Sequence, residues 1–437
     1  MRLRVRAARR LDGIADIPGD KSVSHRAALL GALAQGRTEI TGFLEAEDCG
    51  CTLRAVQALG ASVARKAPGH YLVDGVGLYG LTEPDDVIDC GNSGTTARLL
   101  LGVLAGQPFC TVLTGDDSLR RRPMARVAEP LRRMGATLDG RDEGRRLPLL
   151  ARGARPLHGL EYRSPVASAQ VKSALLLAGL WADGPVTVDE PAPSRDHTER
   201  MLGGFGVRVR RDGTRVTLDP GQALAGQGIA VPGDISSAAF LLAAAAGLAQ
   251  ARVTLRHVGV NPTRAGFLEA LAAMGARVAR DEERGEGGEP VADLTVTSGT
   301  LRGVDIAGDT IPRLIDEVPA LAVLACVAEG ITRVRDAAEL RVKESDRIHA
   351  IAVQLGALGA HVVERSDGIE VHGGRRLRGA TVSSGGDHRM AMALAVAGLL
   401  ADGVTVVEDT ACIATSFPGF VDTVNRLAGE PCVVMEP

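Results

Sequence analysis

The sequence predicts an α/β protein built from six copies of one supersecondary unit. Two sequence signatures alternate along the chain, and each of them occurs six times. Within each copy, the spacing of apolar residues changes from the helical period to the strand period. An ordinary α/β domain could carry such helix ends by coincidence, but two interleaved signatures in register make coincidence a poor explanation.

The first signature is a polar loop that opens an Ala/Leu-rich helix and is followed by a short β-like run such as ADGPVTV. Because these helices are apolar on nearly all sides, we expect them to be buried. Their polar N-termini could then bring six positive helix-dipole ends together. The copies begin at Gly19, Gly91, Ala167, Gly233, Ile315 and Gly385.

The second signature is a helix that ends in Leu or Met and runs into a Gly-Ala-x-Val sequence. Its glycine suits the left-handed position that ends a helix. Each unit, of roughly 65–85 residues, therefore reads as helix, strand, helix, strand, strand. The copies lie at 53–63, 131–138, 199–209, 267–278 and 352–362, with a degraded sixth at 424–434.

The length and composition indicate a globular protein of two or more domains. The chain has 437 residues, a formal net charge of −3 and 45% hydrophobic residues. Aromatic residues make up only 3%, so bases would find few stacking platforms, and we expect no nucleic-acid partner. The matched sequences IPGD (17–20) and VPGD (231–234) are expected to be a pair of strands that connect two halves.

The ends and the cysteines favour a cytoplasmic protein without a membrane partner. The first ten residues alternate charged and apolar side chains like a strand, unlike a signal peptide. The longest apolar stretch, 238–249, is too short to span a bilayer. The seven cysteines lack metal-ligand spacing, and Cys49 and Cys51 are expected to be core or surface thiols, as suits a reducing compartment.

Lysine usage points to specific positions. The chain has 46 arginines and four lysines, and Lys21, Lys172 and Lys343 lie where polar segments meet helices. A compact ammonium with a tunable pKa cannot be replaced by a planar guanidinium, so these three are candidates for binding an anion. Lys66 is expected to be an ordinary surface lysine.

Polar residues gather at the predicted helix starts. Arg, Lys, Ser and backbone N–H groups at such positions bind phosphate and carboxylate, and interspersed carboxylates can transfer protons. Taken singly, Ser22, Asp196, Asp346 and Asp387 could be helix caps or partners in salt bridges. Arg26, Arg98 and Arg389 are different, because each lies early in an apolar helix where an unpaired charge would be costly.

Other site classes are not favoured. The histidines at 25, 197 and 388 lack the spacing of a metal triad. The segment GNSGTTAR lacks the GK[ST] ending of a phosphate-binding loop. A serine nucleophile elbow and a dinucleotide fingerprint are likewise missing from the sequence.

The motifs together resemble the 5-enolpyruvylshikimate-3-phosphate synthase family over the whole chain. The matching strings are GDKSVSHR, GNSGTTAR, RRP, SAQVK, SRDHTE, NPTR, IDE, RVKESDR, GDHRMAM and TSFPGF. Several of them are similar to the class II members, which tend to resist glyphosate.

The resemblance implies the two-domain enolpyruvyl transferase fold, with three βαβαββ repeats in each domain. It places one domain at 1–19 plus 234–437 and the other at 20–233, with helix N-termini facing an interdomain cleft that holds the active site. It implies transfer of the enolpyruvyl group of phosphoenolpyruvate to the 5-hydroxyl of shikimate 3-phosphate, through a tetrahedral intermediate and without metal or cofactor. Glyphosate is the expected inhibitor, and we expect a monomer.

The resemblance also assigns roles by motif. Asp316 would be the base toward the 5-hydroxyl, and Glu344 the acid toward the methylene carbon, with Lys21 assisting. Phosphoenolpyruvate would be bound by Lys21, Gly94, Arg122, Arg347 and Arg389. Shikimate 3-phosphate would be bound by Lys21, Ser22, Arg26, Ser168, Ala169, Gln170, Arg195, Asp316 and Lys343.

Two positions depart from the family pattern. Thr415 stands where many members have a lysine, so that contact is absent or supplied elsewhere. Gly94 stands where strongly resistant members carry alanine, which predicts intermediate glyphosate tolerance.

Two other functions remain as alternatives. The sister transferase acting on UDP-N-acetylglucosamine uses a loop cysteine, whereas the corresponding loop here, TGDDSLRRRP, has none. A non-catalytic anion-binding repeat scaffold would not need Asp316 and Glu344 within the same clusters.

Overall fold

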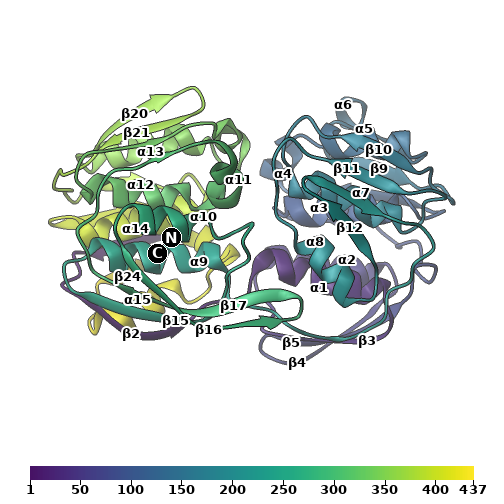
Figure 1. Ribbon diagram of the computed structural model, residues 1–437, viewed down its shortest axis with the longest axis horizontal. Helices are drawn as coiled ribbons and strands as arrows, with labels where there is room; N and C mark the ends of the chain where they lie inside the picture. The colour runs from purple at the N-terminus through teal and green to yellow at the C-terminus, as the bar shows by residue number, and fades with distance from the viewer. The chain divides into compact units, whose positions relative to one another are not determined.

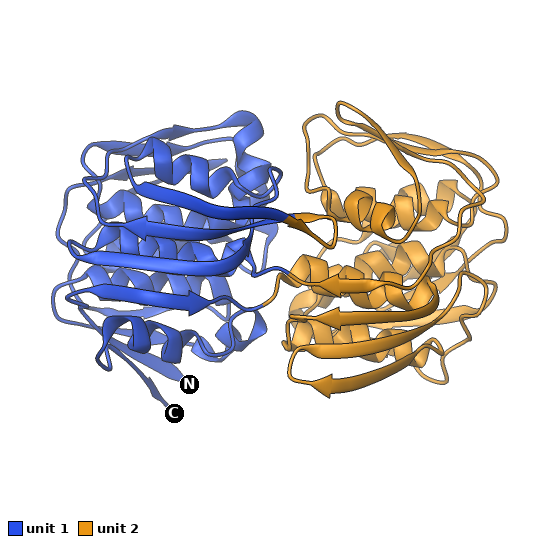
Figure 2. Cartoon of the chain, turned by 60° about the horizontal axis from the view of Figure 1, so that its bottom comes forward, with its two compact units in different colours: residues 1–18, 232–284, 290–437 blue, residues 19–231, 285–289 orange.

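The computed structural model describes residues 1–437, and the chain divides into two compact units. Unit 1 comprises residues 1–18, 232–284 and 290–437, and unit 2 comprises residues 19–231 and 285–289 (Figure 2). Each unit has its own hydrophobic core. None of the helices combines the length and the apolarity needed to cross a bilayer.

The predicted six-fold repeat is confirmed by the sheets, of which there are six with four strands each. In each sheet the first strand of the repeat pairs in parallel with the second, and the second pairs antiparallel with the fourth. The third strand pairs with the fourth at the other edge, as in β10-β11-β13-β12. This order gives the βαβαββ unit, three of which lie in each unit of the chain.

Unit 2 contains three sheets, of order β14-β3-β5-β4, β6-β7-β9-β8 and β10-β11-β13-β12. Their strands are β3 Gln35–Thr41, β4 Ser62–Ala67, β5 His70–Val76, β6 Ile88–Asp89, β7 Cys110–Thr114, β8 Thr137–Gly140, β9 Leu149–Arg152, β10 Leu160–Arg163, β11 Val186–Asp189, β12 Val209–Asp212, β13 Arg215–Leu218 and β14 Gly228–Ala230. The helices are α1 Lys21–Leu33, α2 Glu47–Ala58, α3 Gly94–Leu104, α4 Asp117–Arg121, α5 Ala125–Arg133, α6 Arg141–Gly144, α7 Ala169–Gly179 and α8 His197–Gly204.

Unit 1 contains the sheets β16-β17-β15-β2, β18-β19-β21-β20 and β22-β23-β1-β24. Their strands are β1 Arg2–Arg6, β2 Leu11–Asp16, β15 Ala251–Gly259, β16 Arg277–Glu286, β17 Glu289–Thr297, β18 Asp305–Ile306, β19 Ile331–Val334, β20 His361–Arg365, β21 Gly368–His372, β22 Thr381–Ser383, β23 Val404–Glu408 and β24 Val433–Glu436. The α-helices are α9 Ile235–Gly247, α10 Gly266–Ala273, α11 Ile311–Leu314, α12 Val318–Val327, α13 Arg347–Ala357, α14 His388–Leu400 and α15 Phe420–Ala428. Four 3₁₀ turns complete it: η1 Gly308–Thr310, η2 Ile315–Glu317, η3 Ala338–Val342 and η4 Thr410–Thr415.

The Ala/Leu-rich helices form the centre of each core, as their apolar surfaces require. In unit 1, α9, α12 and α14 pack on one another, with strands of the three sheets outside them (Figure 1). In unit 2, α3 packs against both α7 and α1. Every side chain from Ile235 to Ala246 in α9 is buried. Between their end turns, these helices are therefore buried.

The second helix of each repeat ends at a glycine, as predicted. All six glycines have positive φ, between 72° and 106°, which a residue with a Cβ adopts only with strain. The chain then reverses into the third strand of the repeat. These glycines are Gly60, Gly135, Gly206, Gly275, Gly359 and Gly429.

The IPGD and VPGD segments were expected to be paired strands that connect two halves. The chain does pass between the two units at these segments, but they are not strands. Both are loops with a single bridge residue, and their aspartates cap helices instead. Asp20 accepts a hydrogen bond from the N–H of Val23 at the start of α1, and Asp234 accepts one from Ser236 at the start of α9. A Cβ on Gly19 would lie 1.9 Å from the carbonyl oxygen of Gly42, so the sequence serves close backbone passage and capping.

The cysteines are all free thiols. Cys49 and Cys51, in α2, are both buried, in agreement with their expected role as core thiols.

Candidate active site

Polar side chains at the helix starts of unit 1 form a dense charged cluster. Arg347, the first residue of α13, is fully buried although it carries a charge. Its guanidinium donates to Asp387 (2.8 Å) and Asp316 (3.2 Å), and it donates to Glu344 at 2.6 Å. Burial lowers the pKa of Arg347, but the attraction of these three carboxylates outweighs burial and raises it above its ordinary value.

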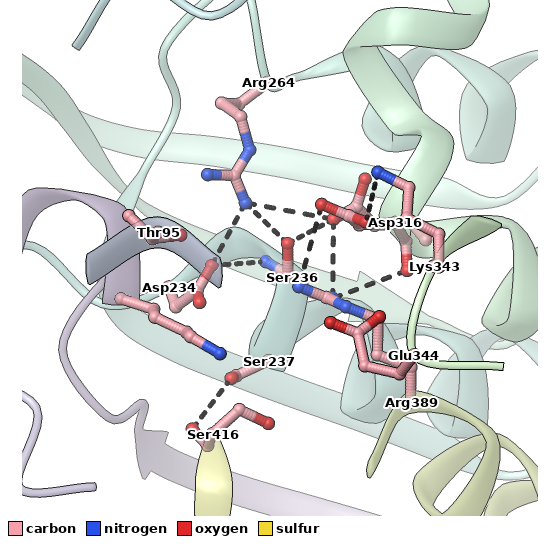
Figure 3. A network of polar contacts seen from close by, with 12 residues as sticks. Thr95, Asp234, Ser236, Ser237, Arg264, Asp316, Lys343, Glu344, Arg389 and Ser416 are labelled. Carbon is pink, nitrogen blue, oxygen red and sulfur yellow. Dashed lines mark hydrogen bonds and ion pairs between the residues drawn. The ribbon is translucent and has the colours of Figure 1, made fainter. Parts of the chain in front are cut away.

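Asp316 lies among three cations at the N-terminal side of α12. Its carboxylate lies 3.7 Å from Lys343 Nζ, 3.2 Å from an Arg347 nitrogen and 3.8 Å from an Arg389 nitrogen. Figure 3 shows Lys343, Glu344 and Arg389 around this carboxylate. Three nearby cations favour the ionised form, which is the form a general base needs.

Asp387 serves two purposes at the start of α14. It caps the helix by accepting hydrogen bonds from the N–H groups of Arg389 and Met390, and it binds Arg347. Burial raises the pKa of Asp387, but Arg347 more than offsets this and the pKa lies below its ordinary value. Asp387 was expected to be a helix cap or a salt-bridge partner, and it is both.

A second buried network in unit 1 was not among the site residues expected from the sequence. Arg264 donates to Ser236 (2.5 Å) and Asp234 (3.2 Å) (Figure 3). Ser236 in turn donates to Glu317. Glu317 is fully buried beside Asp316, so this network fixes the turn that carries Asp316. The NPTR motif at 261–264 was the available signal, since it places an arginine in an otherwise apolar segment.

Thr415, where a lysine was expected from the family pattern, is the last residue of η4. The neighbouring Ser416 is buried, and its carbonyl oxygen accepts a hydrogen bond from Ser237 Oγ at 3.3 Å (Figure 3). The segment is therefore held by α9 through its backbone.

In unit 2, Lys21 begins α1 and forms an ion pair with Asp48 of α2. Asp48 is buried, whereas the Lys21 side chain keeps 18% of its surface exposed. His25, one turn further along α1, is buried and contacts Thr52 Oγ1 at 2.7 Å. Burial, together with the nearby Lys21, lowers the pKa of His25 to about 3. The ammonium of Lys21 is therefore the charge that α1 presents at this position.

Arg26 is buried and connects three helices. It donates to Thr198 of α8 (2.7 Å), to Ser173 of α7 (2.8 Å) and to the carbonyl oxygen of Ser22 (3.0 Å). Burial lowers its pKa to about 10, so the guanidinium stays charged at neutral pH.

A second group in unit 2 surrounds the start of α3. Arg98 donates to Gln170 Oε1 at 2.8 Å, and Arg122 donates to Asn92 Oδ1 at 2.7 Å. Gly94 lies between the two arginines: a Cβ there would be 2.8 Å from a terminal nitrogen of Arg98 and 3.4 Å from one of Arg122. Arg26 and Arg98 thus donate to neutral oxygen acceptors, whereas Arg389 lies 3.8 Å from the Asp316 carboxylate.

The remaining expected residues lie at the starts of α7 and α8. Ser168 precedes α7, Ala169 is its first residue, and the Ser168 N–H donates to Glu190 at 2.8 Å. Arg195 is half-buried just before α8, close enough for its charge to lower the pKa of Arg26 further. Ser22, Arg26, Ser168, Gln170 and Arg195 are therefore grouped within unit 2, whereas Asp316, Lys343, Glu344, Arg347 and Arg389 are grouped within unit 1.

Comparison with known proteins identifies the family. The sequence profile of EPSP synthase (3-phosphoshikimate 1-carboxyvinyltransferase) matches residues 5–424. The chain is 55% identical to the 3-phosphoshikimate 1-carboxyvinyltransferase of Desulforudis audaxviator over 98% of its length and 99% of the relative's. It is 56% identical to that of Geobacter sulfurreducens over 96% of this chain and 98% of the relative.

Solved structures agree with this result. The EPSP synthase of Acinetobacter baumannii superimposes with a TM-score of 0.90 at 44% identity, covering 100% of both chains. With the repeat fold and the two polar clusters, these similarities show that the chain belongs to the EPSP synthase family and is a transferase that moves the enolpyruvyl group of phosphoenolpyruvate to shikimate 3-phosphate.

Proposed function

We propose that the polar clusters of the two units serve this one reaction, with Asp316 as the residue that deprotonates the acceptor alcohol. The observation that supports this role is the surroundings of the Asp316 carboxylate. It is largely buried and lies within 4 Å of cationic groups on Lys343, Arg347 and Arg389. An ionised carboxylate at this position can accept the proton of the 5-hydroxyl. A site that only bound anions would gain nothing from it.

The phosphate and carboxylate of phosphoenolpyruvate require several cations. We assign the binding of these two anionic groups to Lys21 and Arg122 of unit 2 and to Arg347 and Arg389 of unit 1. The backbone at Gly94 is assigned to the same substrate. A guanidinium can bind a carboxylate or phosphate through two parallel hydrogen bonds, which fixes its orientation as well as its position. Arg122 is held in place by Asn92, and Arg347 and Arg389 are held by nearby carboxylates, Asp316 among them.

Shikimate 3-phosphate is assigned to a group rich in hydroxyls and backbone N–H donors. It comprises Ser168, Ala169 and Gln170 at the start of α7, with the cations of Arg195 and Lys21. Arg26 and Ser22 complete the group in unit 2. Lys343 and Asp316 of unit 1 are assigned to the ring hydroxyls, where the bond to the enolpyruvyl group forms.

Formation of the tetrahedral intermediate needs two proton transfers, and its breakdown needs a third. Asp316 removes the proton of the 5-hydroxyl as its oxygen bonds to C2 of phosphoenolpyruvate, and a proton is added to C3, giving the tetrahedral intermediate. Glu344, which is bound to Arg347, is assigned as the acid toward C3, with Lys21 assisting. Loss of phosphate with a proton from the methyl group then restores the double bond.

Glyphosate is proposed as an inhibitor that competes for the phosphoenolpyruvate cations, with an intermediate level of tolerance. The class II motifs favour tolerance, whereas Gly94 spares Arg98 the close contact that an alanine Cβ would make with it. We propose that the enzyme acts as a monomer, since each assigned group comes from this chain.

The roles of the two site lysines are tested by conservative substitution. Lys21→Arg and Lys343→Arg keep the charge but replace a compact ammonium with a planar group, so we expect most activity to be lost while the circular dichroism spectrum is kept. Lys66→Arg, at an exposed position in β4, is the matched control. Near-normal turnover by either site variant would refute its role.

A further inference from the structure

Lys172 is a buried charge that the reaction scheme above does not use. It lies in the second turn of α7 and is 2% exposed. Its Nζ lies 2.8 Å from Glu190 Oε2, 2.9 Å from Glu199 Oε1 and 3.4 Å from the carbonyl oxygen of Ser194. An ammonium has three N–H donors, and here three acceptors surround it.

Glu190 extends these contacts to two loops. Its Oε1 accepts a hydrogen bond from the N–H of Ser168 at 2.8 Å, and its Oε2 accepts one from Ser194 Oγ at 2.7 Å. Ser168 ends the loop that leads into α7, and Ser194 lies in the loop that leads into α8. Lys172 and Glu190 therefore join the loop before Ala169 to the loop that carries Arg195.

Glu199 extends the same cluster to Arg26. Burial lowers the pKa of the Arg26 guanidinium, and the attraction of the Glu199 carboxylate is the largest effect that opposes this lowering. Glu199 and Glu190 likewise raise the pKa of Lys172 above its ordinary value, although burial opposes them. Two cations, Lys172 and Arg26, thus interact with the carboxylate of Glu199, and Lys172 also pairs with Glu190, in a largely buried region.

We propose that Lys172 is a positioning residue for the shikimate 3-phosphate group: it holds the loops of Ser168 and Arg195 in place through Glu190 and Glu199. This proposal rests on the assignment of Ser168, Gln170 and Arg195 to that substrate. It also explains why a chain with 46 arginines keeps a lysine here, because a guanidinium is too large and too planar for three acceptors around one nitrogen.

The test compares the effect of Lys172 variants on the KM for shikimate 3-phosphate with their effect on the KM for phosphoenolpyruvate. In Lys172→Arg and Lys172→Met, we expect the KM for shikimate 3-phosphate to rise about tenfold or more, and the KM for phosphoenolpyruvate to change less than about twofold. Calorimetric titration of shikimate 3-phosphate alone should show the same weakening in Kd. Lys66→Met, at an exposed lysine, should change neither constant.

Two further variants distinguish a loss of positioning from a loss of stability. Lys172→Met/Glu199→Gln removes the charge imbalance that Lys172→Met creates, and it should recover thermal stability without recovering the KM for shikimate 3-phosphate. Glu190→Gln keeps the lysine and the side-chain volume, and it should raise the same KM. A folded variant with an unchanged KM for shikimate 3-phosphate, or a failure of all these variants to fold, would overturn the positioning role.

Arg195→Gln serves as the reference for the underlying assignment. If it raises the KM for shikimate 3-phosphate while the Lys172 variants do not, the positioning role alone is wrong. If it leaves that KM unchanged, the assignment of the substrate to this group is wrong.

Discussion

Asp387 caps α14 through the N–H groups of Arg389 and Met390, and the same carboxylate binds the Arg347 guanidinium. A cap and a charge partner were treated as alternatives for this residue, but one carboxylate has enough acceptor sites for both. Removing it would expose the helix start and leave Arg347 with less compensation. At the residue scale, the carboxylate that caps α14 is also the one that holds the Arg347 guanidinium.

Asp316 is the residue whose substitution tests the chemistry. Asp316→Asn keeps the shape but cannot accept the proton of the 5-hydroxyl, so we expect turnover to fall by about 100-fold or more. Binding of shikimate 3-phosphate should be weakened much less. Phosphate release and calorimetric binding provide the two readouts, and Asp309→Asn, at an exposed carboxylate in η1, is the control. Equal losses of binding and turnover would assign Asp316 to binding alone.

Gly94 lies between the side chains of Arg98 and Arg122. In Gly94→Ala the new Cβ would meet Arg98 Nη1 at 2.8 Å and must displace this guanidinium, which binds Gln170. We expect a higher inhibition constant for glyphosate and higher KM values for both substrates. Steady-state kinetics with glyphosate as a competitor measure all three constants. An inhibition constant that does not change would count against the role given to Gly94.

His25 predicts a pH dependence of stability. Its pKa is about 3 in the folded protein against 6.5 ordinarily, so between these values the unfolded chain binds the extra proton. Stability is therefore unaffected above pH 6.5 and is lost as pH falls below it, by about 1.4 kcal/mol per pH unit from this group. His25→Asn should flatten that decline in urea unfolding between pH 6.5 and 4, whereas His158→Asn, at an exposed histidine, should not. A decline of the same steepness in both variants would show that His25 does not cause it.

At the scale of elements, the repeat was predictable because it depends on local chemistry. The apolar helices, their polar starts and the glycines that end the second helices are all visible in the periodicity and composition. The IPGD and VPGD segments were wrongly predicted to be strands because a short apolar run beside Pro and Gly resembles a strand. Their function depends on a close backbone approach at Gly19, which no local pattern reveals.

Helix α13 offers a matched test of this reasoning. Gly356 lies in the helix, where an added Cβ would meet no atom within 4 Å, whereas Gly359 follows the helix with φ of 89°. Gly356→Ala should stabilise unit 1 by about 0.5–1 kcal/mol, because alanine is the better helix former. Gly359→Ala should destabilise it by about 1–2 kcal/mol, because a Cβ is strained at that φ. Urea unfolding of both variants gives the comparison, and equal effects would contradict the assigned helix end.

At the scale of the whole molecule, the chain leaves unit 1 after residue 18, builds all three repeats of unit 2 and returns at residue 232. Residues 285–289, at the turn between β16 and β17, group with unit 2, where Glu289 binds His197 at 2.7 Å. The sequence could predict the residue types of both clusters, because anion binding demands Arg, Lys and helix starts. It could not predict Glu190, Glu199, Asp48 or Glu317 as their partners, because those contacts join segments far apart in the chain.

The central claim is that the charged groups of both units carry out one enolpyruvyl transfer. It is tested most directly by phosphate release from phosphoenolpyruvate by the full chain, with and without shikimate 3-phosphate. We predict release only when both substrates are present. Binding of both substrates without release, or release that depends on UDP-N-acetylglucosamine instead, would contradict the account.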